Sequence, residues 1–392
     1  MTERVREAER KASGPLVGVR VIELAGKGSV PYCGMLLSDF GADVIRIDRP
    51  NPSGRKFSHY VDPLSRGRRS VAIDLKNPKG VETVLRLVES ADAIIEGFRP
   101  GVMERLGLGP NECHTRNEKL VYGRITGWGQ EGPLAQAAGH DLNYIALTGV
   151  LHAIGQAARP PPAPLALIGD FGGGGVFLAL GVVCAILEAK ISGKGQVVDA
   201  AMIEGVSSLM TFIHGLNAAG WWREQREANM LDGGAHFYST YETKDGKYVS
   251  FSPIEPEFHE AAIVLLGIDP VDMPARMDRD GWPVWKARLK ELFLEKTRDE
   301  WCRILDGTDA CFAPVLSLAE APDHPQNKAR GVFINHDGMT QPAPTPRFSR
   351  TPGDIQRAAP LPGQHSQEAL LDWGLTAAEV DALLKNGAIR RA

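Results

Sequence analysis

Two ionisable residues in glycine-rich surroundings are the first candidates for acid–base chemistry in this chain, His140 and Asp170. His140 follows a glycine and precedes an aspartate, and Asp170 precedes the run Phe171–Gly175, which ends in four glycines. Consecutive glycines are costly inside a helix, so the run predicts backbone that approaches a ligand closely where the next helix begins. Free N–H groups and the positive end of that helix would then lie beside Asp170. An acid, a base and an anion-stabilising helix end could together transfer protons.

Both residues also have structural explanations. An aspartate before a helix is often an N-cap, and a single histidine is more often a core or surface residue than a catalytic group. The helix predicted at about 176–190 is apolar on nearly all sides, so we expect it to be buried. Spacing alone leaves the catalytic and the structural roles of His140 and Asp170 open.

Composition and charge exclude several functional classes. The chain has 392 residues, enough for two domains with sizeable cores, and its net charge of −4 offers no basic face for nucleic acid. Its five cysteines are scattered without metal-ligand spacing, which favours a reducing compartment and no metal site. The longest apolar run, near 176–187, is too short to span a bilayer. We predict a cytoplasmic protein without nucleic-acid or membrane partners, whose charged residues 1–14 form a disordered tail.

Strands and helices alternate through the first half of the chain. Strands are predicted at 19–25, 42–48, 70–75, 93–96 and 120–125, and helices at 31–40 and 78–90, the second with Asn77 as its N-cap. This alternation is typical of βαβ units with parallel strands. It predicts a large α/β domain over 15–220, with an open parallel, Rossmann-like sheet.

The pattern changes between residues 226 and 313. Short strands at 236–242 and 247–252 precede amphipathic helices at 257–266, 284–294 and 298–305, which indicates a smaller α+β domain. A proline-rich stretch, 341–362, is predicted to be extended, and a last helix, 377–385, should end at Asn386-Gly387.

A glycine turn after the first strand raises the possibility of a dinucleotide site. Gly26 and Gly28 follow the strand, and Asp48 lies about twenty residues on, where a ribose-binding acid would stand. The sixth position of the fingerprint is Pro31, however, and the third glycine is needed for close helix–strand packing. We therefore favour a tight turn in a doubly wound sheet over a nicotinamide site.

Arginines gather near the ends of the predicted strands. In a parallel sheet, the carboxyl ends of the strands share the edge where ligands bind, and several arginines there could hold a polyphosphate. The alternative is a solvated rim of ion pairs. The arginines in question are Arg46, Arg49, Arg66, Arg68, Arg69, Arg99 and Arg105.

Several motifs resemble the α-methylacyl-CoA racemases, a branch of the family III CoA-transferases. They include the Gly-His-Asp-x-Asn-Tyr element within 126–155, the LIGDFGGGG segment at 167–175, and GKGQVVDAAMIEG at 193–205. Segments 228–250, 253–258 and 342–353 match the same branch. The resemblance extends over nearly the whole chain beyond the first fourteen residues, and the histidine element marks the racemase branch.

The resemblance implies an architecture. The large domain would be built from both ends of the chain, with 330–392 as a return segment, and 226–313 would form the small domain. Two subunits would interlock as a homodimer, and each site would lie between the large domain of one subunit and the small domain of the other. No metal or separate cofactor is implied, because CoA is part of the substrate.

The resemblance also implies roles for individual residues. His140 and Asp170 would be the two acid/bases, and Glu255 would pair with the histidine. The positions assigned to CoA contacts are Arg49, Ile73, Asp74, Leu75, Lys76, Gly97, Phe98, Arg99 and Arg105. The segment that contacts the substrate would contain Gly139, Asp141, Leu142, Asn143 and Tyr144.

The implied reaction is epimerisation of (2R)- and (2S)-2-methylacyl-CoA thioesters. One group would remove the proton next to the thioester, a stabilised enolate would form, and a second group would return a proton to the opposite face. A family III CoA-transferase, in which Asp170 attacks the acyl-CoA as a nucleophile, is the alternative. A non-catalytic acyl-CoA-binding protein is the alternative from another class.

Overall fold

The computed structural model of the protein describes residues 13–50, 62–269, 271, 273 and 275–392. They form two compact units, a larger one within 1–148, 164–209 and 333–392 and a smaller one within 149–163 and 210–332. The sequence-based domain ranges divide the chain at other residues and stay predictions. Most of the predicted tail, 1–14, lies outside the described residues.

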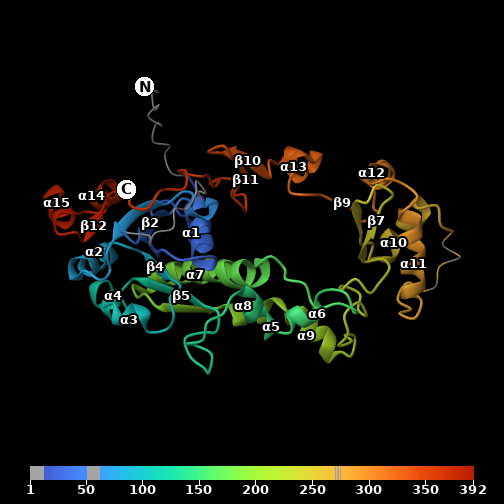
Figure 1. The fold of residues 1–392 in the computed structure, drawn as a ribbon, viewed down its shortest axis with the longest axis horizontal. Helices are drawn as coiled ribbons and strands as arrows, with labels where there is room; N and C mark the ends of the chain where they lie inside the picture. The colour runs from blue at the N-terminus through green and yellow to red at the C-terminus, as the bar shows by residue number, and fades with distance from the viewer. Residues whose placement is uncertain (1–12, 51–61, 270, 272, 274) are drawn as a thin grey trace. The chain divides into compact units, whose positions relative to one another are not determined.

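A seven-stranded sheet forms the centre of the larger unit (Figure 1), with the order β12-β3-β2-β1-β4-β5-β6. Six strands are parallel, which confirms the predicted open α/β sheet, and β12 pairs antiparallel with β3. The strands are β1 (Arg20–Leu24), β2 (Asp43–Asp48), β3 (Arg69–Ile73), β4 (Ala93–Glu96), β5 (Val121–Thr126), β6 (Val197–Ala201) and β12 (Ile389–Arg390).

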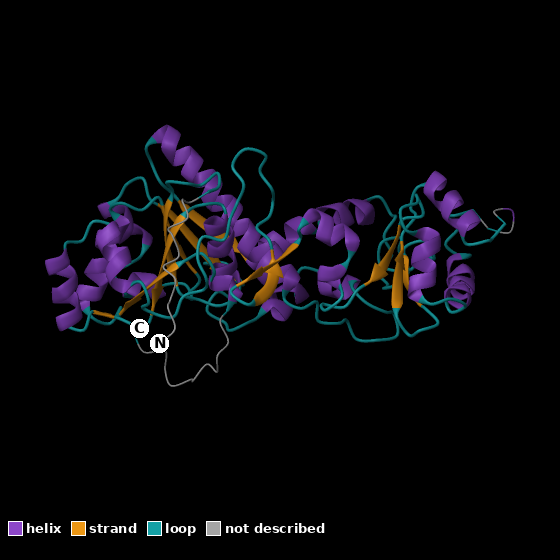
Figure 2. Cartoon of the chain, turned by 90° about the horizontal axis from the view of Figure 1, so that it is seen from above, coloured by secondary structure: helices purple, strands orange, loops and turns teal. Residues whose placement is uncertain are grey.

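Helices cover both faces of this sheet (Figure 2), and the strand sequences explain why. Successive side chains of a strand point to opposite faces, and β1 places apolar residues on each: Ile22 and Leu24 pack in one core cluster, and Val21 packs in the other. The first cluster includes α2 (Pro78–Val88), α4 (Pro110–Arg116), α14 (Ser366–Asp372) and α15 (Ala377–Lys385). The second includes α1 (Ser29–Asp39), α7 (Phe177–Ser192) and α8 (Met202–Leu209).

The sequence predicted that the glycine run would precede the next helix as non-helical backbone. In the structure the run is itself helical. Residues Leu167–Val176 form a π-helical segment (η2) that continues directly into α7. A Cβ added at Gly173 would lie 2.5 Å from Val206 Cγ2, and one added at Gly175 would lie 2.8 Å from the Ser29 carbonyl oxygen. The glycines therefore permit close contact with α8 and α1, which outweighs their poor helix propensity.

One side of α7 is exposed, so the prediction that this helix is buried was wrong. Leu178 and Val182 are fully buried against the sheet. The opposite side carries a row of exposed apolar residues at helical spacing, which we call the α7 stripe: Val176, Leu180, Cys184, Leu187 and Ile191. Exposure reaches 58 % at Leu180 and 82 % at Ile191. Such a row on a folded unit is typical of a surface that another protein covers.

Because η2 and α7 are continuous, this apolar stretch is longer than the sequence suggested. By length and composition, Leu167–Ser192 is the one helical stretch in the described residues that could cross a membrane. Leu178, Val182 and Ile186 nonetheless pack in the core cluster beside the sheet. Core helices of folded domains also meet this criterion, so length and composition alone are weak evidence for a membrane span.

The smaller unit has its own sheet and core. Its antiparallel strands are β7 (Ser239–Glu242), β8 (Tyr248–Phe251) and β9 (Phe312–Val315), in the order β7-β8-β9. Fully buried Phe251, Phe293 and Trp301 lie in one cluster with residues of α10 (Pro256–Leu265), α11 (Trp282–Phe293) and α12 (Arg298–Leu305). The predicted strands and helices of this region are present, and β9 was not predicted. The shorter helices are α6 (Val150–Ala153), α9 (Thr211–Ala218) and α13 (Pro325–Arg330).

The C-terminal segment returns to the large sheet. After the hairpin β10 (Phe333–His336) and β11 (Met339–Pro342) the chain is largely irregular until α14 and α15. Helix α15 occupies the residues predicted for it, and its N-cap Thr376 accepts the N–H of Glu379. The chain then adds β12 to the edge of the sheet, with Ile389 opposite Ile73.

Candidate functional site

His140 lies at the start of a short helix, α5 (Asp141–Ala146), with its side chain exposed. The backbone N–H of His140 donates to Asn143 Oδ1 at 3.0 Å, which fixes the first turn. Tyr144 on the same helix donates its hydroxyl to the Gly139 carbonyl and packs edge-on against Trp128 at 4.8 Å between ring centroids. Local contacts at the start of α5 therefore position the histidine.

Asp141 joins the two predicted catalytic segments. Its side chain is 5 % exposed, and Oδ1 accepts the N–H groups of Gly169 at 2.6 Å and Asp170 at 2.7 Å. This corrects the expectation that the N–H groups beside Asp170 are free, because Asp141 occupies two of them. It also brings the backbone of Asp170 to the residue that follows His140, although the two segments are far apart in the sequence.

His140, Asp170 and Tyr144 interact electrostatically, because the charge of His140 affects the pKa of Asp170 and the charge of Asp170 affects the pKa of Tyr144. Burial raises the pKa of Asp170, the negative charge of Asp141 raises it further, and His140 lowers it. Burial and the charge of Asp170 likewise raise the pKa of Tyr144. The acid therefore holds its proton more strongly than an exposed aspartate, which suits a group that must both take and give a proton.

The glycine turn after β1 lies against Asp170. Gly28 has a φ of 65°, and a Cβ added to it would lie 2.9 Å from Asp170 Oδ2. Any larger residue would be strained and would displace the carboxylate. The tight turn expected here is present, and its close approach is to a candidate catalytic acid.

A cavity of about 340 Å³, the smaller edge pocket, opens beside His140 at the carboxyl ends of β4 and β5. Its lining includes His140, Tyr144 and Gly139 from the α5 region. The loop after β4 contributes Gly97, Phe98 and Arg99, three of the positions that the resemblance assigns to CoA.

A second cavity of about 520 Å³, the larger edge pocket, follows the carboxyl ends of β1, β2 and β3. Phe98 lines both pockets, so they adjoin along the edge of the sheet where ligands bind in open α/β folds. Leu24, Ile47 and Leu106 provide apolar walls. Among the predicted positions, this pocket brings together Arg49, Ile73, Asp74, Leu75, Lys76 and Phe98.

Glu96 holds the loop between the two pockets, and the sequence analysis did not identify it. It is 1 % exposed, its Oε2 accepts the Phe98 N–H at 2.7 Å, and its Oε1 accepts from Arg124 Nε at 3.2 Å. Arg124 also donates to Glu104 Oε1 at 3.0 Å, on α3 (Val102–Arg105). Burial raises the pKa of Glu96 to about 7. A carboxylate at the end of a buried strand was the available sequence signal.

The remaining predicted positions are more scattered. Arg105 lies on α3 and Leu142 on α5, where Leu142 is 44 % exposed, and neither lines the two edge pockets. Arg66, Arg68 and Arg69 form ion pairs with Asp39, Glu23 and Asp43 respectively. These three arginines form ion pairs, as the structural alternative expected, but the arginines are buried, so the pairs are not the solvated rim that was predicted.

Glu255 belongs to the smaller unit. It is the N-cap of α10 and is exposed, and its side chain caps no helical N–H. Among the described residues it has no side-chain hydrogen bond or ion pair. Its pairing with His140 stays a prediction.

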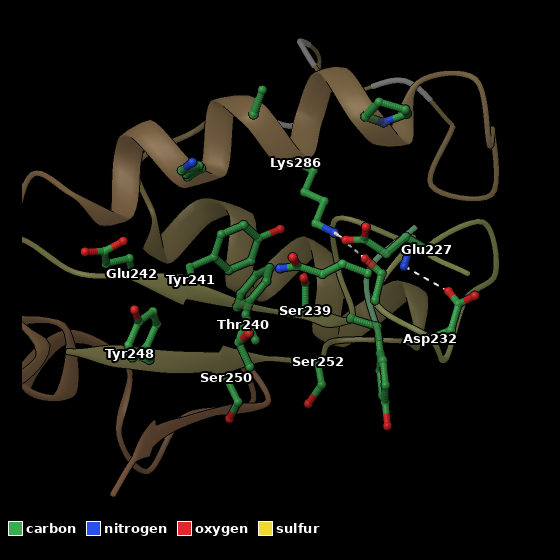
Figure 3. A pocket seen from close by; sticks show the side chains of 18 of the residues that line it. Glu227, Asp232, Ser239, Thr240, Tyr241, Glu242, Tyr248, Ser250, Ser252 and Lys286 are labelled. Carbon is green, nitrogen blue, oxygen red and sulfur yellow. Dashed lines mark hydrogen bonds and ion pairs between the residues drawn. The ribbon is translucent and has the colours of Figure 1, made fainter. Parts of the chain in front are cut away.

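The smaller unit has a cavity of its own, of about 1090 Å³, lined by residues of β7, β8 and α11 (Figure 3). Lys286 of α11 extends into it and pairs with Glu227 at 3.0 Å. Thr240, Glu242, Tyr248 and Ser250 line its sheet side, and Glu255 is not part of the lining. Across the described part of the chain, no group of three or more His, Cys, Asp or Glu side chains is arranged to hold a metal ion.

Comparisons with known proteins show which enzymes the chain is similar to. Alpha-methylacyl-CoA racemases from Mus musculus and Homo sapiens are 44 % and 43 % identical to the chain, covering 93 % of it and 95 % of each relative. Succinyl-CoA–D-citramalate CoA-transferase from Chloroflexus aurantiacus is 33 % identical, covering 92 % of the chain and 95 % of the relative.

Solved structures and a family model lead to the same group. The crystal structure of a CAIB/BAIF family protein from Brucella suis superposes with a TM-score of 0.80 at 26 % identity, covering 92 % of this chain and all of that one. A model described as CoA-transferase family III matches residues 16–366. The resemblance predicted from the motifs is confirmed, and the chain belongs to the CoA-transferase family III.

Proposed function

We propose that the protein is an isomerase that epimerises (2R)- and (2S)-2-methylacyl-CoA thioesters, the activity of an α-methylacyl-CoA racemase. The observation that carries the proposal is the Asp141 contact, which brings the Asp170 backbone to the His140 segment beside the smaller edge pocket. The identity to racemases supports the same activity. The adjoining larger edge pocket offers cations and apolar walls for the nucleotide part of CoA.

In the proposed reaction, two groups act on opposite faces of C2. One removes the proton, the electrons of the C–H bond move into the thioester as an enolate, and the other group donates a proton to the opposite face. His140 and Asp170 exchange these roles between the two epimers, and Glu255 assists the histidine. Each acid or base contributes about 10²–10⁴-fold. The raised pKa of Asp170 favours its acid role, because it brings the proton affinity of the carboxylate closer to neutral pH.

The proposed reaction uses only side chains of the protein. CoA enters and leaves as part of the substrate, and we propose that no separate cofactor takes part. We also propose a cytoplasmic location, from the scattered cysteines.

A transferase that forms an anhydride on Asp170 is the second candidate, supported by the identity to a CoA-transferase. Hydroxylamine added to the enzyme during turnover distinguishes the two. A racemase should yield no hydroxamate on Asp170 in peptide mass spectrometry, whereas a trapped Asp170 would favour the transferase.

We also propose that the active protein is an interlocked homodimer in which Glu255 reaches the His140 of the other subunit. The exposed α7 stripe supports a second copy, because an apolar row of this length is costly to leave in water. Light scattering should give a dimer at micromolar concentration. Replacing Leu180 and Leu187 by aspartate should produce inactive monomers, and Lys190→Glu on the same helix should not. An active monomer would contradict the dimer.

Exchange of the C2 proton with solvent deuterium tests the activity itself. A panel of 2-methylacyl-CoA thioesters of one configuration should incorporate one deuterium and lose optical purity together. If the thioesters neither incorporated deuterium nor lost optical purity, at enzyme concentrations that bind CoA, racemisation would be contradicted and acyl-CoA binding would remain as the function.

A further inference from the structure

The C-terminal strand contributes a cation to the larger edge pocket that the predicted set does not contain. Arg390 lies on β12 opposite Ala72 of β3, and it lines the pocket together with Gly387. The last element predicted from the sequence ends at residue 385, before this strand and its arginine.

The backbone of Arg390 is firmly held, whereas its side chain is exposed. The Ser366 hydroxyl donates to the Arg390 carbonyl at 2.6 Å and accepts the Ala72 N–H at 3.1 Å. The Asp74 N–H donates to the Ala388 carbonyl at 2.8 Å, which extends the link to the end of β3. Among the described residues, the guanidinium of Arg390 has no hydrogen bond or ion pair. A fixed backbone that carries an unpaired guanidinium is suited to ligand binding.

The order of strands places Arg390 far from the acid–base residues. From β12 the edge runs through β3, β2 and β1 to β4, which precedes Phe98. Four strand spacings of about 4.8 Å separate β12 from β4, about 19 Å in all. Lys76 follows β3 and Arg49 follows β2, so both lie between Arg390 and the smaller edge pocket.

CoA is itself linear, with the thioester at one end and the adenosine 3′-phosphate at the other. This inference rests on the proposed function, which places the thioester beside His140. The nucleotide must then extend past Phe98 into the larger edge pocket. Its diphosphate, which precedes the adenosine, would meet the cations of β2 and β3 first.

We propose that Arg390 binds the ribose 3′-phosphate of CoA and makes the enzyme prefer CoA over 3′-dephospho-CoA. A guanidinium can bind a phosphate monoester with two parallel hydrogen bonds, and the pairing is charge-assisted. Neither described acid of the pocket, Asp48 or Asp74, bonds to the Arg390 guanidinium, and each has other partners. Asp48 is engaged by Arg46 at 3.2 Å and Ser70 at 2.6 Å, and Asp74 accepts the Lys76 N–H at 2.9 Å.

Calorimetric titration with CoA and with 3′-dephospho-CoA tests this proposal in the full-length protein. The wild type should bind CoA on the order of tenfold more tightly. Arg390→Ala should lose that factor for CoA and bind 3′-dephospho-CoA as the wild type does, and Arg390→Lys should be intermediate. Arg391→Ala is the matched control, because Arg391 bonds to Gln367 and lines a different cavity. It should behave as the wild type.

Two results would overturn the proposal. A wild type that binds both ligands equally has no 3′-phosphate site, and an Arg390→Ala variant that loses affinity for both ligands equally uses the arginine elsewhere. A wild type that binds neither ligand would contradict the proposed function itself. Thermal unfolding of each variant separates these results from a loss of folded protein.

Discussion

The two ends of the carboxyl edge of the large sheet are built differently. At the acid–base end, Asp141 is nearly fully buried and binds the backbone before Asp170, and Gly28 packs against the Asp170 carboxylate. In the larger edge pocket, Arg49 and Arg390 are exposed cations above apolar walls. The first end is positioned by buried contacts, and the second offers charge at a surface.

Because of this difference, we expect proton transfer and CoA binding to respond separately to mutation. Proton transfer requires groups held close to the reacting carbon before the substrate arrives. Phosphate binding requires charge within reach and tolerates a flexible side chain. Changes at the acid–base end should therefore lower kcat, and changes in the larger edge pocket should raise Kd for CoA.

The largest effect is expected from replacing the acid–base residues. His140→Ala or Asp170→Asn should each lower the rate of epimerisation by about 10²–10⁴-fold, because one proton-transfer partner is lost. Calorimetry should show CoA affinity within about threefold of the wild type, below the free energy of one hydrogen bond. A loss of CoA affinity in the same variants would contradict the proposal that proton transfer and CoA binding respond separately to mutation.

Charge reversal in the larger edge pocket should weaken CoA binding and leave kcat unchanged. Arg49→Glu should weaken CoA binding by about 10–100-fold, through loss of one charge-assisted contact and added repulsion. At saturating substrate, kcat should remain near that of the wild type. NAD should bind neither protein, and tight NAD binding without CoA binding would restore the dinucleotide interpretation.

Glu96, between the two ends, should make the protein less stable as the pH rises. Its pKa is about 7 in the folded chain against 4.5 when exposed, so the unfolded chain releases the proton first. Stability from this residue is present below about pH 4.5 and falls as the pH rises to about 7, by on the order of 3 kcal/mol. Glu96→Gln should flatten the fall in Tm between pH 5 and 8. Glu379→Gln on α15, whose parent carboxylate has a lowered pKa, should leave it. An equal slope in Glu96→Gln and wild type would contradict this account.

The smallest effect concerns the charge of Asp141. Asp141→Asn keeps an oxygen that can accept both N–H groups but removes a negative charge that raises the pKa of Asp170. The acidic limb of the pH–rate profile should move to lower pH. Asp74→Asn, a carboxylate in the larger edge pocket, should not move it. A shift to higher pH in Asp141→Asn would show that another group sets the limb.

Much of the large unit could be predicted, because its determinants are local. The strands β1 to β5 follow from short β-branched runs, and Asn77 caps α2 through its own side chain. The tight turn at Gly28 followed from the missing third glycine of the fingerprint. The proximity of Phe98 and Lys76 to one pocket followed from the shared edge of parallel strands.

What could not be predicted depends on contacts between distant parts of the chain. The glycines after Phe171 are helical because α8 and α1 pack against them, and nothing local indicates those partners. The bonds from Gly169 and Asp170 to Asp141 join separate segments. Arg390 reaches the larger edge pocket only because β12 pairs with β3, more than 300 residues earlier.

We propose that His140 and Asp170 act on opposite faces of C2 of the substrate, and deuterium exchange from each pure epimer tests this directly. Each pure epimer of a 2-methylacyl-CoA is incubated in deuterium oxide with the wild type, His140→Ala or Asp170→Ala, and deuterium at C2 is followed by mass spectrometry. We expect His140→Ala to lose exchange from the (S) epimer, Asp170→Ala to lose it from the (R) epimer, and neither to convert one epimer into the other. If His140→Ala exchanged both epimers as the wild type does, the histidine would be structural and the division of labour proposed here would be contradicted.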